Sequence, residues 1–288
     1  MKIGDVKRIG IIGAGQMGCG IAFVAATNGW EVLLYDIKET ALQAAMKKIR
    51  EGLARAVEKG TLKADQVDPS LARLRLTGRL EDVAETQFII EAAPEESTLK
   101  AKLFRHMGLL CKPETILASN TSSISITKLG TASGRPDRVV GIHFMNPVPV
   151  MRLVEIVRGL ETSDDTMALA LDLARRMGKT PVVCKDAPGF IVNRILIPMI
   201  NEAVFALQDE VGTPEAIDLA MTAGANHPVG PLALADRIGL DTILAICEVL
   251  YQDLGDPKFR PCPLLCKYVE AGWLGRKTGR GFYTWTSD

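Results

Sequence analysis

Short apolar runs alternate with amphipathic stretches through the first two thirds of the chain. A run of this kind, bounded by polar or turn-forming residues, is typical of a buried β-strand. The expected strands are 8–12, 31–35, 71–76, 87–91, 115–118, 138–143, 151–157 and 181–184. Residues 38–59 place apolar side chains at helical spacing, which predicts a long helix. Strands that alternate with helices predict a doubly wound α/β fold, with a parallel sheet covered by helices.

The strand pattern ends at residues 185–189, KDAPG, and helical patterns follow. The predicted helices are 190–210, 231–252 and 262–272. Pro198 predicts a kink in the first of them. Thr213, followed by a proline and an acid, is a typical helix start. We therefore expect an α/β domain over 1–187 and a helical domain over 188–288 that supplies a substrate-binding wall and a dimer surface.

Composition narrows the class of protein. The chain has 288 residues, 47% of them hydrophobic, and 34 basic residues balance 34 acidic ones. Without a basic excess, we expect neither nucleic acid nor a membrane surface as a partner. The six cysteines lack metal-type spacing, so we expect reduced thiols and no metal site. No signal peptide or membrane-spanning run is evident, which favours a cytoplasmic protein.

A glycine-rich loop follows the first predicted strand and opens the first helix. Gly13 allows a tight turn, Gly15 lets the backbone approach a pyrophosphate, and Gly18 lets the helix pack closely on the strand. The helix N-terminus adds unpaired N–H groups that attract phosphates. A turn without a ligand is the alternative, but the strand before and the helix after favour dinucleotide binding.

Asp36, at the end of the second predicted strand, selects the cofactor. A carboxylate there accepts hydrogen bonds from the adenosine ribose and repels a 2′-phosphate. This favours NAD over NADP, although an acid at a strand end can also cap the next helix.

The best candidate for proton transfer is His143. It ends the run RVVGIHF, and open α/β sheets bind ligands at the carboxyl ends of their strands. Glu155 lies inside the next apolar run, where a buried carboxylate needs a partner. A bond from this acid would fix the histidine tautomer and raise its basicity. The alternatives are a structural histidine and a glutamate that faces water.

Two further polar groups are candidates. Asn120 and Ser122, in the cluster SNTSS after another apolar run, either form an ordinary turn or contact the nicotinamide and the substrate. Asn193 lies at the start of the helix after the expected domain boundary, where a cleft is expected, or else bonds to nearby backbone.

These residues stand in longer motifs that match a known family. The chain resembles the short-chain L-3-hydroxyacyl-CoA dehydrogenases, especially the bacterial 3-hydroxybutyryl-CoA dehydrogenases. The matching segments are GAGQMG, SNTSS, GIHFMNPVPVMRLVEIV, CKDAPGFIVNR, NHPVGPLALADRIGLD and GRKTGRGFY. They occur in the expected order and cover both predicted domains.

The resemblance implies a reaction and a set of roles. It implies that NAD(H) exchanges a hydride with (S)-3-hydroxyacyl-CoA, in particular 3-hydroxybutyryl-CoA, giving 3-ketoacyl-CoA such as acetoacetyl-CoA. His143 would be the general acid/base, oriented by Glu155. Ser122 would contact the reacting oxygen, and Asn193 would hold the substrate near the reacting carbon.

Further positions are expected to contact the cofactor or CoA. The cofactor contacts expected from the motifs and the resemblance are Gly13, Gly15, Gln16, Met17, Gly18, Asp36, Glu95, Lys100, Asn120, Ser122, Asn146 and Lys277. The resemblance places CoA near Arg55 and Lys59, which share one helix face; basic residues there can also be merely solvated.

Two other functions compete with this one. A dehydrogenase of a free hydroxy acid or sugar acid, as in lambda-crystallin-like proteins, shares much of the pattern. A non-catalytic NAD-binding sensor would keep the fold without needing the His143–Glu155 pair.

Overall fold

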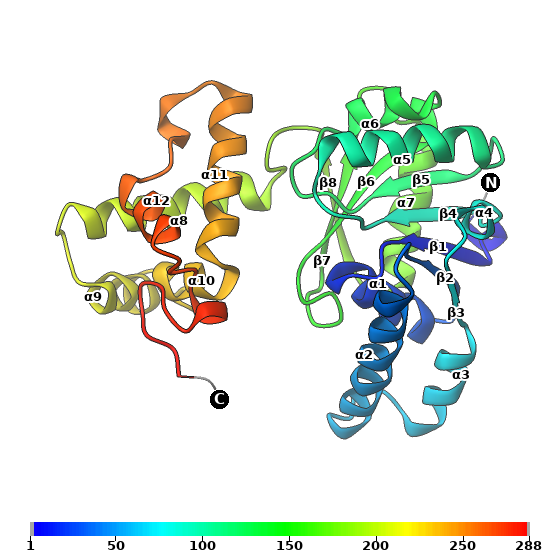
Figure 1. Cartoon of the computed structure of the whole chain (residues 1–288), viewed down its shortest axis with the longest axis horizontal. Helices are drawn as coiled ribbons and strands as arrows, with labels where there is room; N and C mark the ends of the chain where they lie inside the picture. The colour runs from blue at the N-terminus through cyan, green and yellow to red at the C-terminus, as the bar shows by residue number, and fades with distance from the viewer. Residues whose placement is uncertain (1–2, 287–288) are drawn as a thin grey trace. The chain divides into compact units, whose positions relative to one another are not determined.

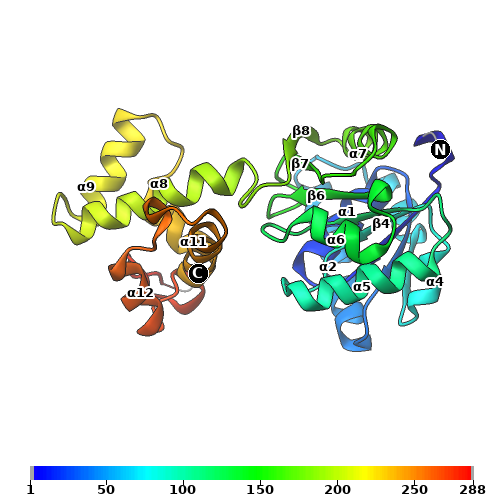
Figure 2. The ribbon, with the colours of Figure 1, turned by 90° about the horizontal axis from the view of Figure 1, so that it is seen from above.

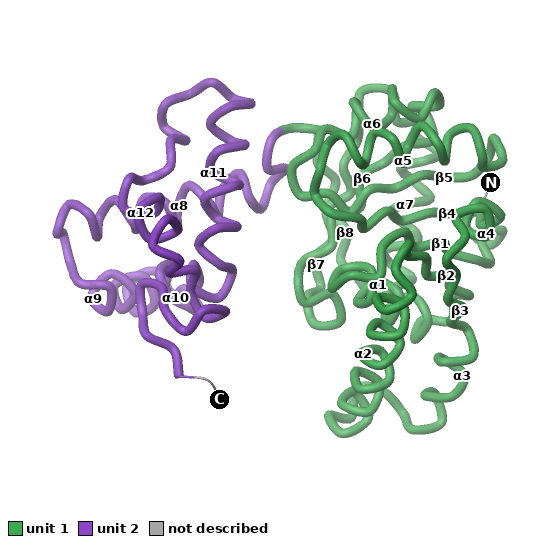
Figure 3. The backbone as a smooth tube through the Cα atoms, viewed as in Figure 1, with its two compact units in different colours: residues 1–187 green, residues 188–288 purple. Residues whose placement is uncertain are grey.

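The computed structural model describes residues 3–286, which form two compact units. Unit 1 spans Met1–Ala187 and unit 2 spans Pro188–Asp288 (Figure 3). Each unit is built around its own hydrophobic core.

Unit 1 contains one sheet of eight strands in the order β3-β2-β1-β4-β5-β6-β7-β8 (Figure 1). The strands are β1 (Arg8–Ile12), β2 (Glu31–Tyr35), β3 (Leu74–Thr77), β4 (Phe88–Glu91), β5 (Ile116–Ser119), β6 (Val139–Phe144), β7 (Leu153–Arg158) and β8 (Thr180–Lys185). All neighbouring pairs are parallel except β6 and β7, which are antiparallel. The carboxyl end of β6 therefore lies beside the amino end of β7.

Helices cover both faces of this sheet (Figure 2). Side chains of α1, α2 and α7 share one core cluster on one face, while α5 and α6 pack against each other on the other face. The helices are α1 (Gln16–Thr27), α2 (Glu39–Glu58), α3 (Val67–Ala72), α4 (Leu80–Ala84), α5 (Ser97–Leu110), α6 (Ile126–Ser133) and α7 (Asp164–Arg176). Short 3-10 turns add η1 (Ile3–Asp5), η2 (Ala64–Gln66) and η3 (Pro136–Arg138).

The predicted doubly wound α/β fold is confirmed, and the expected helix over 38–59 is α2. The predicted strand 71–76 is only half right. Its first residues belong to the end of α3, and β3 begins at Leu74. The buried strands explain why the pattern was strong, since β4, β5 and β6 bury every residue and so form continuous apolar runs.

Unit 2 is helical. Its elements are α8 (Val192–Gln208), α9 (Pro214–Leu219), the π-helical turn η4 (Ala220–Gly224), α10 (Pro231–Ile238), α11 (Leu240–Leu254), η5 (Pro257–Phe259), α12 (Pro263–Glu270) and η6 (Arg276–Thr278). Helix α8 continues through Pro198, and the Thr213 hydroxyl caps α9 by accepting from Ala216 N–H. The predicted helix 231–252 is two helices, because Gly239 adopts φ 105° between α10 and α11.

A buried carboxylate binds the C-terminal segment of unit 2 to its core through hydrogen bonds. Asp236, 1% exposed, accepts hydrogen bonds from the backbone N–H groups of Phe282 and Tyr283 and from the indole N–H of Trp285. Asp218 similarly accepts from the Tyr283 hydroxyl. These hydrogen bonds replace the ones that the two carboxylates made to water before folding.

None of the helices formed by residues 3–286 has the length and apolar character needed to cross a membrane. All six cysteines are free thiols.

Candidate active site

The glycine-rich loop has little room for side chains where it turns. Gly13 has φ 104°, and a Cβ there would lie 2.6 Å from the carbonyl oxygen of Ala92. A Cβ on Gly18 would lie 1.8 Å from the Gly13 carbonyl oxygen. A Cβ on Gly15, by contrast, would meet nothing within 4 Å. The loop is thus packed against the segment that follows β4 and against the first turn of α1, and it is open at Gly15, where α1 begins.

Asp36 is half-buried directly after β2. One carboxylate oxygen accepts from Ala14 N–H at 2.9 Å, and the other accepts from Lys38 N–H at 2.9 Å. The first bond ties the acid to the glycine-rich loop, 22 positions away. Each oxygen has a second lone pair that can accept a ribose hydroxyl.

These features fit NAD. The open space at Gly15 adjoins the N-terminus of α1, which carries no side-chain cap, so its N–H groups can bind a pyrophosphate. Asp36 also has the spacing from the glycine-rich loop, about 20 residues along the chain, at which the dinucleotide-binding fingerprint has an acid. Among residues 3–286, no cluster of side chains suited to a metal ion occurs.

His143 and Glu155 are direct partners across the antiparallel strands β6 and β7. Glu155 Oε2 lies 2.7 Å from His143 Nδ1. The two side chains are 10% and 1% exposed. The bond to Nδ1 makes Nε2 the ring nitrogen that can exchange a proton with a substrate. Burial first, and then the charges of Glu155 and Asp186, raise the pKa of Cys184 on β8 to about 12.

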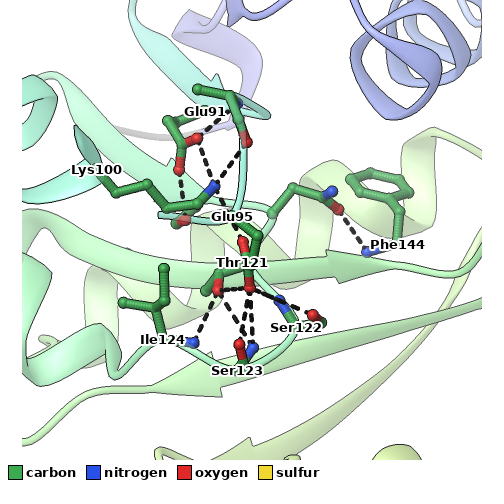
Figure 4. A network of polar contacts seen from close by, with 11 residues as sticks. Glu91, Glu95, Lys100, Thr121, Ser122, Ser123, Ile124 and Phe144 are labelled. Carbon is green, nitrogen blue, oxygen red and sulfur yellow. Dashed lines mark hydrogen bonds and ion pairs between the residues drawn. The ribbon is translucent and has the colours of Figure 1, made fainter. Parts of the chain in front are cut away.

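The loop after β5 wraps around one carboxylate (Figure 4). Glu95 Oε1 accepts from the Thr121 hydroxyl at 2.5 Å and from the backbone N–H groups of Ser122 at 2.9 Å and Ser123 at 3.2 Å. The hydroxyls of both serines lie within 3.3 Å of the same oxygen. Burial would raise the pKa of Glu95, but the charge of Lys100 and these hydrogen bonds hold it below its usual value.

A second acid lies deeper in the same network (Figure 4). Glu91, the last residue of β4, accepts from Lys100 Nζ, Ala93 N–H and the Ser119 hydroxyl, each at 2.6 Å. Lys100, on α5, also pairs with Glu95 at 3.4 Å. Glu91 was not among the site residues predicted from the sequence. Its signal was an acid that ends the apolar run FIIE, as Asp36 does for the second predicted strand.

Asn120 and Asn146 connect the predicted site residues of unit 1. Asn120 Oδ1 accepts from the N–H of Phe144, the residue after His143. The Gln16 side chain donates to Asn146 Oδ1 at 3.0 Å, which links the glycine-rich loop to the segment after β6. Met17, half-buried, packs against the core of unit 1.

The remaining candidates lie elsewhere. Arg55 and Lys59 are exposed at the end of α2, and neither forms an ion pair with the residues that the structure describes. Asn193 and Lys277 belong to unit 2. Asn193 is the second residue of α8. Lys277 Nζ lies 2.6 Å from both carboxylate oxygens of Asp241.

A glycine-rich loop, an acid directly after the second strand and a histidine held by a buried glutamate together fit an NAD-dependent dehydrogenase. Comparison with known families makes this more specific. The 3-hydroxyacyl-CoA dehydrogenase NAD binding domain matches residues 8–187, and the C-terminal domain of the same family matches residues 189–285. The chain belongs to the 3-hydroxyacyl-CoA dehydrogenase family.

Similar proteins cover nearly its whole length. A probable 3-hydroxybutyryl-CoA dehydrogenase of Bacillus subtilis is 52% identical over 97% of each chain. A 3-hydroxybutyryl-CoA dehydrogenase of Bradyrhizobium diazoefficiens is also 52% identical, over 96% of this chain and 95% of its own. The crystal structure of (S)-3-hydroxybutyryl-CoA dehydrogenase from Ralstonia eutropha has a TM-score of 0.95 at 48% identity, covering 98% of this chain and 100% of its own.

Proposed function

We propose that this enzyme interconverts (S)-3-hydroxybutyryl-CoA and acetoacetyl-CoA with NAD(H). The observation that carries the proposal is the buried His143–Glu155 pair at the end of β6, in the family whose relatives bear that activity in their names. A histidine buried against a carboxylate is suited to proton transfer at a reacting hydroxyl.

Proton transfer is the main chemical task of the chain's own residues. In oxidation, His143 Nε2 removes the proton of the 3-hydroxyl, and in reduction it returns that proton to the forming alkoxide. The bond from Glu155 to Nδ1 holds the ring tautomer and stabilises the imidazolium. NAD supplies the hydride acceptor when it is bound, and Asp36 with the α1 N-terminus orients it.

The loop after β5 holds the reacting oxygen. Ser122 contacts that oxygen, and Glu95 fixes the serine through its backbone N–H and its hydroxyl. Asn193 of unit 2 contacts the substrate near the reacting carbon. Precise alignment of these groups matters, because holding reactants in place lowers the entropic part of the barrier.

The CoA portion of the substrate carries phosphates that need basic partners. Arg55, in the last turn of α2, and Lys59, the residue directly after the helix, are exposed and lie four positions apart, so both can face one ligand. We assign them to CoA binding.

We assign substrate binding and homodimer formation to unit 2. Large apolar side chains of this unit are exposed, among them Ile195 at 65% and Leu219 at 65%. Sedimentation of the purified enzyme checks this assignment: a dimer supports it and a monomer contradicts it.

The decisive experiment measures NADH oxidation with 3-ketoacyl-CoA substrates from C4 to C16. We expect the highest kcat/KM with acetoacetyl-CoA and a lower value with NADPH in place of NADH. Turnover of free 3-keto acids or sugar acids, with none of the thioester, would favour the competing dehydrogenase function. Tight NADH binding without turnover of either class would indicate a sensor.

A further inference from the structure

We propose that Lys179 positions the connection 145–152, which links β6 to β7 and carries Asn146. This inference rests on the proposed function, because it concerns how the groups of that site are held. Lys179 is then a positioning residue, which acts on the reaction through the backbone of the connection.

The connection 145–152 takes its position from its neighbours. It forms a tight turn, in which the backbone N–H groups of Val150 and Met151 both donate to the Pro147 carbonyl oxygen at 3.0 Å. The side chains of Val150 and Met151 are 72% and 40% exposed, so they add little packing of their own. A segment with few buried contacts keeps one conformation only if other elements hold it.

Lys179 holds this turn from the side of α7 and β8. Its ammonium donates to the carbonyl oxygens of Val148 and Met151, the second at 2.9 Å. Its own backbone N–H donates to the Ala174 carbonyl oxygen at 3.0 Å, which fixes the lysine to the end of α7. Burial lowers the pKa of Lys179, and the two carbonyl oxygens replace water as its hydrogen-bond partners. One side chain thus joins two points of the connection.

Helix α1 holds the same turn from the other side. Val148 is 2% exposed and packs against α1 at Gly20, where a Cβ would lie 2.9 Å from the Val148 Cβ. The Gln16 side chain, in the first turn of α1, donates to Asn146 Oδ1 at 3.0 Å. Lys179 therefore holds the connection against the helix that the glycine-rich loop opens.

The position of the connection matters for the proposed reaction. It begins directly after Phe144, the last residue of β6, and His143 precedes that residue. Asn146 lies beside the glycine-rich loop through its bond to Gln16. Loss of the two lysine bonds should let the turn shift and move these groups together. A misplacement of about 1 Å in an active site can lower the rate about 100-fold.

The test compares Lys179→Met, which keeps the aliphatic stem and removes the donors, with wild type. Lys102→Met, an exposed lysine on α5, is the matched control. The concentration of folded sites is taken from NADH fluorescence titration, so that unfolded protein does not lower the apparent kcat. We expect kcat per site with acetoacetyl-CoA to fall about 10- to 100-fold in Lys179→Met, with KM for acetoacetyl-CoA changed by less than about threefold.

This division between kcat and KM separates positioning from other roles. A purely structural lysine would change Tm and the fraction of folded sites but leave kcat per site at the wild-type value. A raised KM for acetoacetyl-CoA at unchanged kcat would show that Lys179 binds the substrate. Either result overturns the proposal.

Hydrogen exchange tests the connection directly. The N–H groups of Val150 and Met151 should exchange faster in Lys179→Met than in wild type and in Lys102→Met. Unchanged exchange across 145–152 would contradict the proposal.

Gly20→Ala displaces the same connection and leaves Lys179 intact. The added methyl group presses on Val148, so kcat per site should fall again with KM for acetoacetyl-CoA unchanged. In the double variant with Lys179→Met, the two losses should not multiply, because both act on one segment. Independent losses would contradict the proposal. If Lys179→Met does not fold, wild-type turnover in Gly20→Ala contradicts it as well.

Failure of the proposed function would be seen separately. A wild-type enzyme that binds NADH but does not turn over acetoacetyl-CoA would refute that function. Hydrogen exchange of 145–152 in Lys179→Met would still test whether the lysine holds the connection.

Discussion

His143 and Glu155 face each other across two antiparallel strands, and Glu155 Oε2 lies 2.7 Å from His143 Nδ1. Both side chains are buried, so water does not compete for this bond. In the function that we propose, this geometry makes Nε2 the ring nitrogen that exchanges a proton with the substrate, and it makes the glutamate part of the acid/base group.

The pair should control turnover and not cofactor binding. We expect His143→Gln to lower kcat by about 10²- to 10⁴-fold, the usual contribution of a positioned acid/base. Glu155→Gln should lower kcat, because the His143 ring loses the carboxylate that fixes its tautomer. The affinity for NADH should stay unchanged. The exposed His106→Gln on α5 is the control for a histidine change of the same kind. Near-normal turnover in His143→Gln would remove this residue from the mechanism.

Asp36 should determine the choice of cofactor. In Asp36→Ala the ribose hydroxyls lose their acceptor and the repulsion of a 2′-phosphate disappears. The ratio of kcat/KM for NADH to that for NADPH should therefore fall by at least about tenfold, the equivalent of one good polar contact. Glu39→Ala, at the start of α2, controls for a nearby loss of negative charge. Equal ratios in Asp36→Ala and wild type would contradict the assignment.

Arg55 and Lys59 should affect one substrate only. Arg55→Ala and Lys59→Ala remove cations that we assign to CoA phosphates, so each should raise KM for acetoacetyl-CoA several-fold and leave KM for NADH unchanged. The effect should shrink at high salt, since screened charges attract less. Arg105→Ala, on the opposite face of the sheet, is the control. Unchanged KM values for both substrates would show that the two side chains are merely solvated.

Glu95 should contribute to stability only while it is ionised. Its pKa lies below the ordinary value of 4.5, so its stabilising contribution is present above that value and is lost as the pH falls through the lowered pKa. Glu95→Gln should therefore lose less Tm than wild type when the pH is taken from about 6 to about 3.5. Parallel Tm curves for the two proteins across this range would contradict the expectation.

Asp236 should be a polar position of unit 2 at which a substitution lowers stability. Both carboxylate oxygens of Asp236 accept hydrogen bonds from backbone and indole N–H groups. Asp236→Asn replaces one of these oxygens with an NH2 group, which cannot accept them. Each buried donor left unpaired costs about 1–3 kcal/mol, so we expect the free energy of unfolding to fall by about 2–4 kcal/mol. Urea unfolding measures this change, with the exposed Asp253→Asn as the control. A variant as stable as wild type would show that these bonds are replaced by water.

The parts of the fold that were predictable are those with a strong local pattern. The apolar runs located the strands, and the glycine loop could be placed because Gly13 and Gly18 tolerate no side chain. The antiparallel direction of β7 was not predictable, since an apolar run has the same pattern in either direction. The end of α10 at Gly239 was missed because the apolar spacing continues on both sides of the break.

Some residues of the candidate site were likewise predictable from the sequence, and others were not. His143 and Glu155 were found together, because a histidine at a strand end and an acid within an apolar run each need an explanation. Glu91 was missed, although it is an acid at the end of the apolar run FIIE. Its meaning depends on Lys100, nine positions further along the chain, and only the packing of α5 on the sheet brings the two together.

The antiparallel step between β6 and β7 bears on the order of events in folding. His143 and Glu155 are 12 positions apart, joined by the short connection 145–152. Partners on adjacent parallel strands would need a crossover of about a dozen residues or more, usually with its own helix. Because short loops close quickly and at low entropic cost, the two residues of the proposed proton-transfer group can meet before the distant strands β1 and β4 align. We therefore expect this site to begin folding as a local hairpin, which the glycine-rich loop and Asp36 join later.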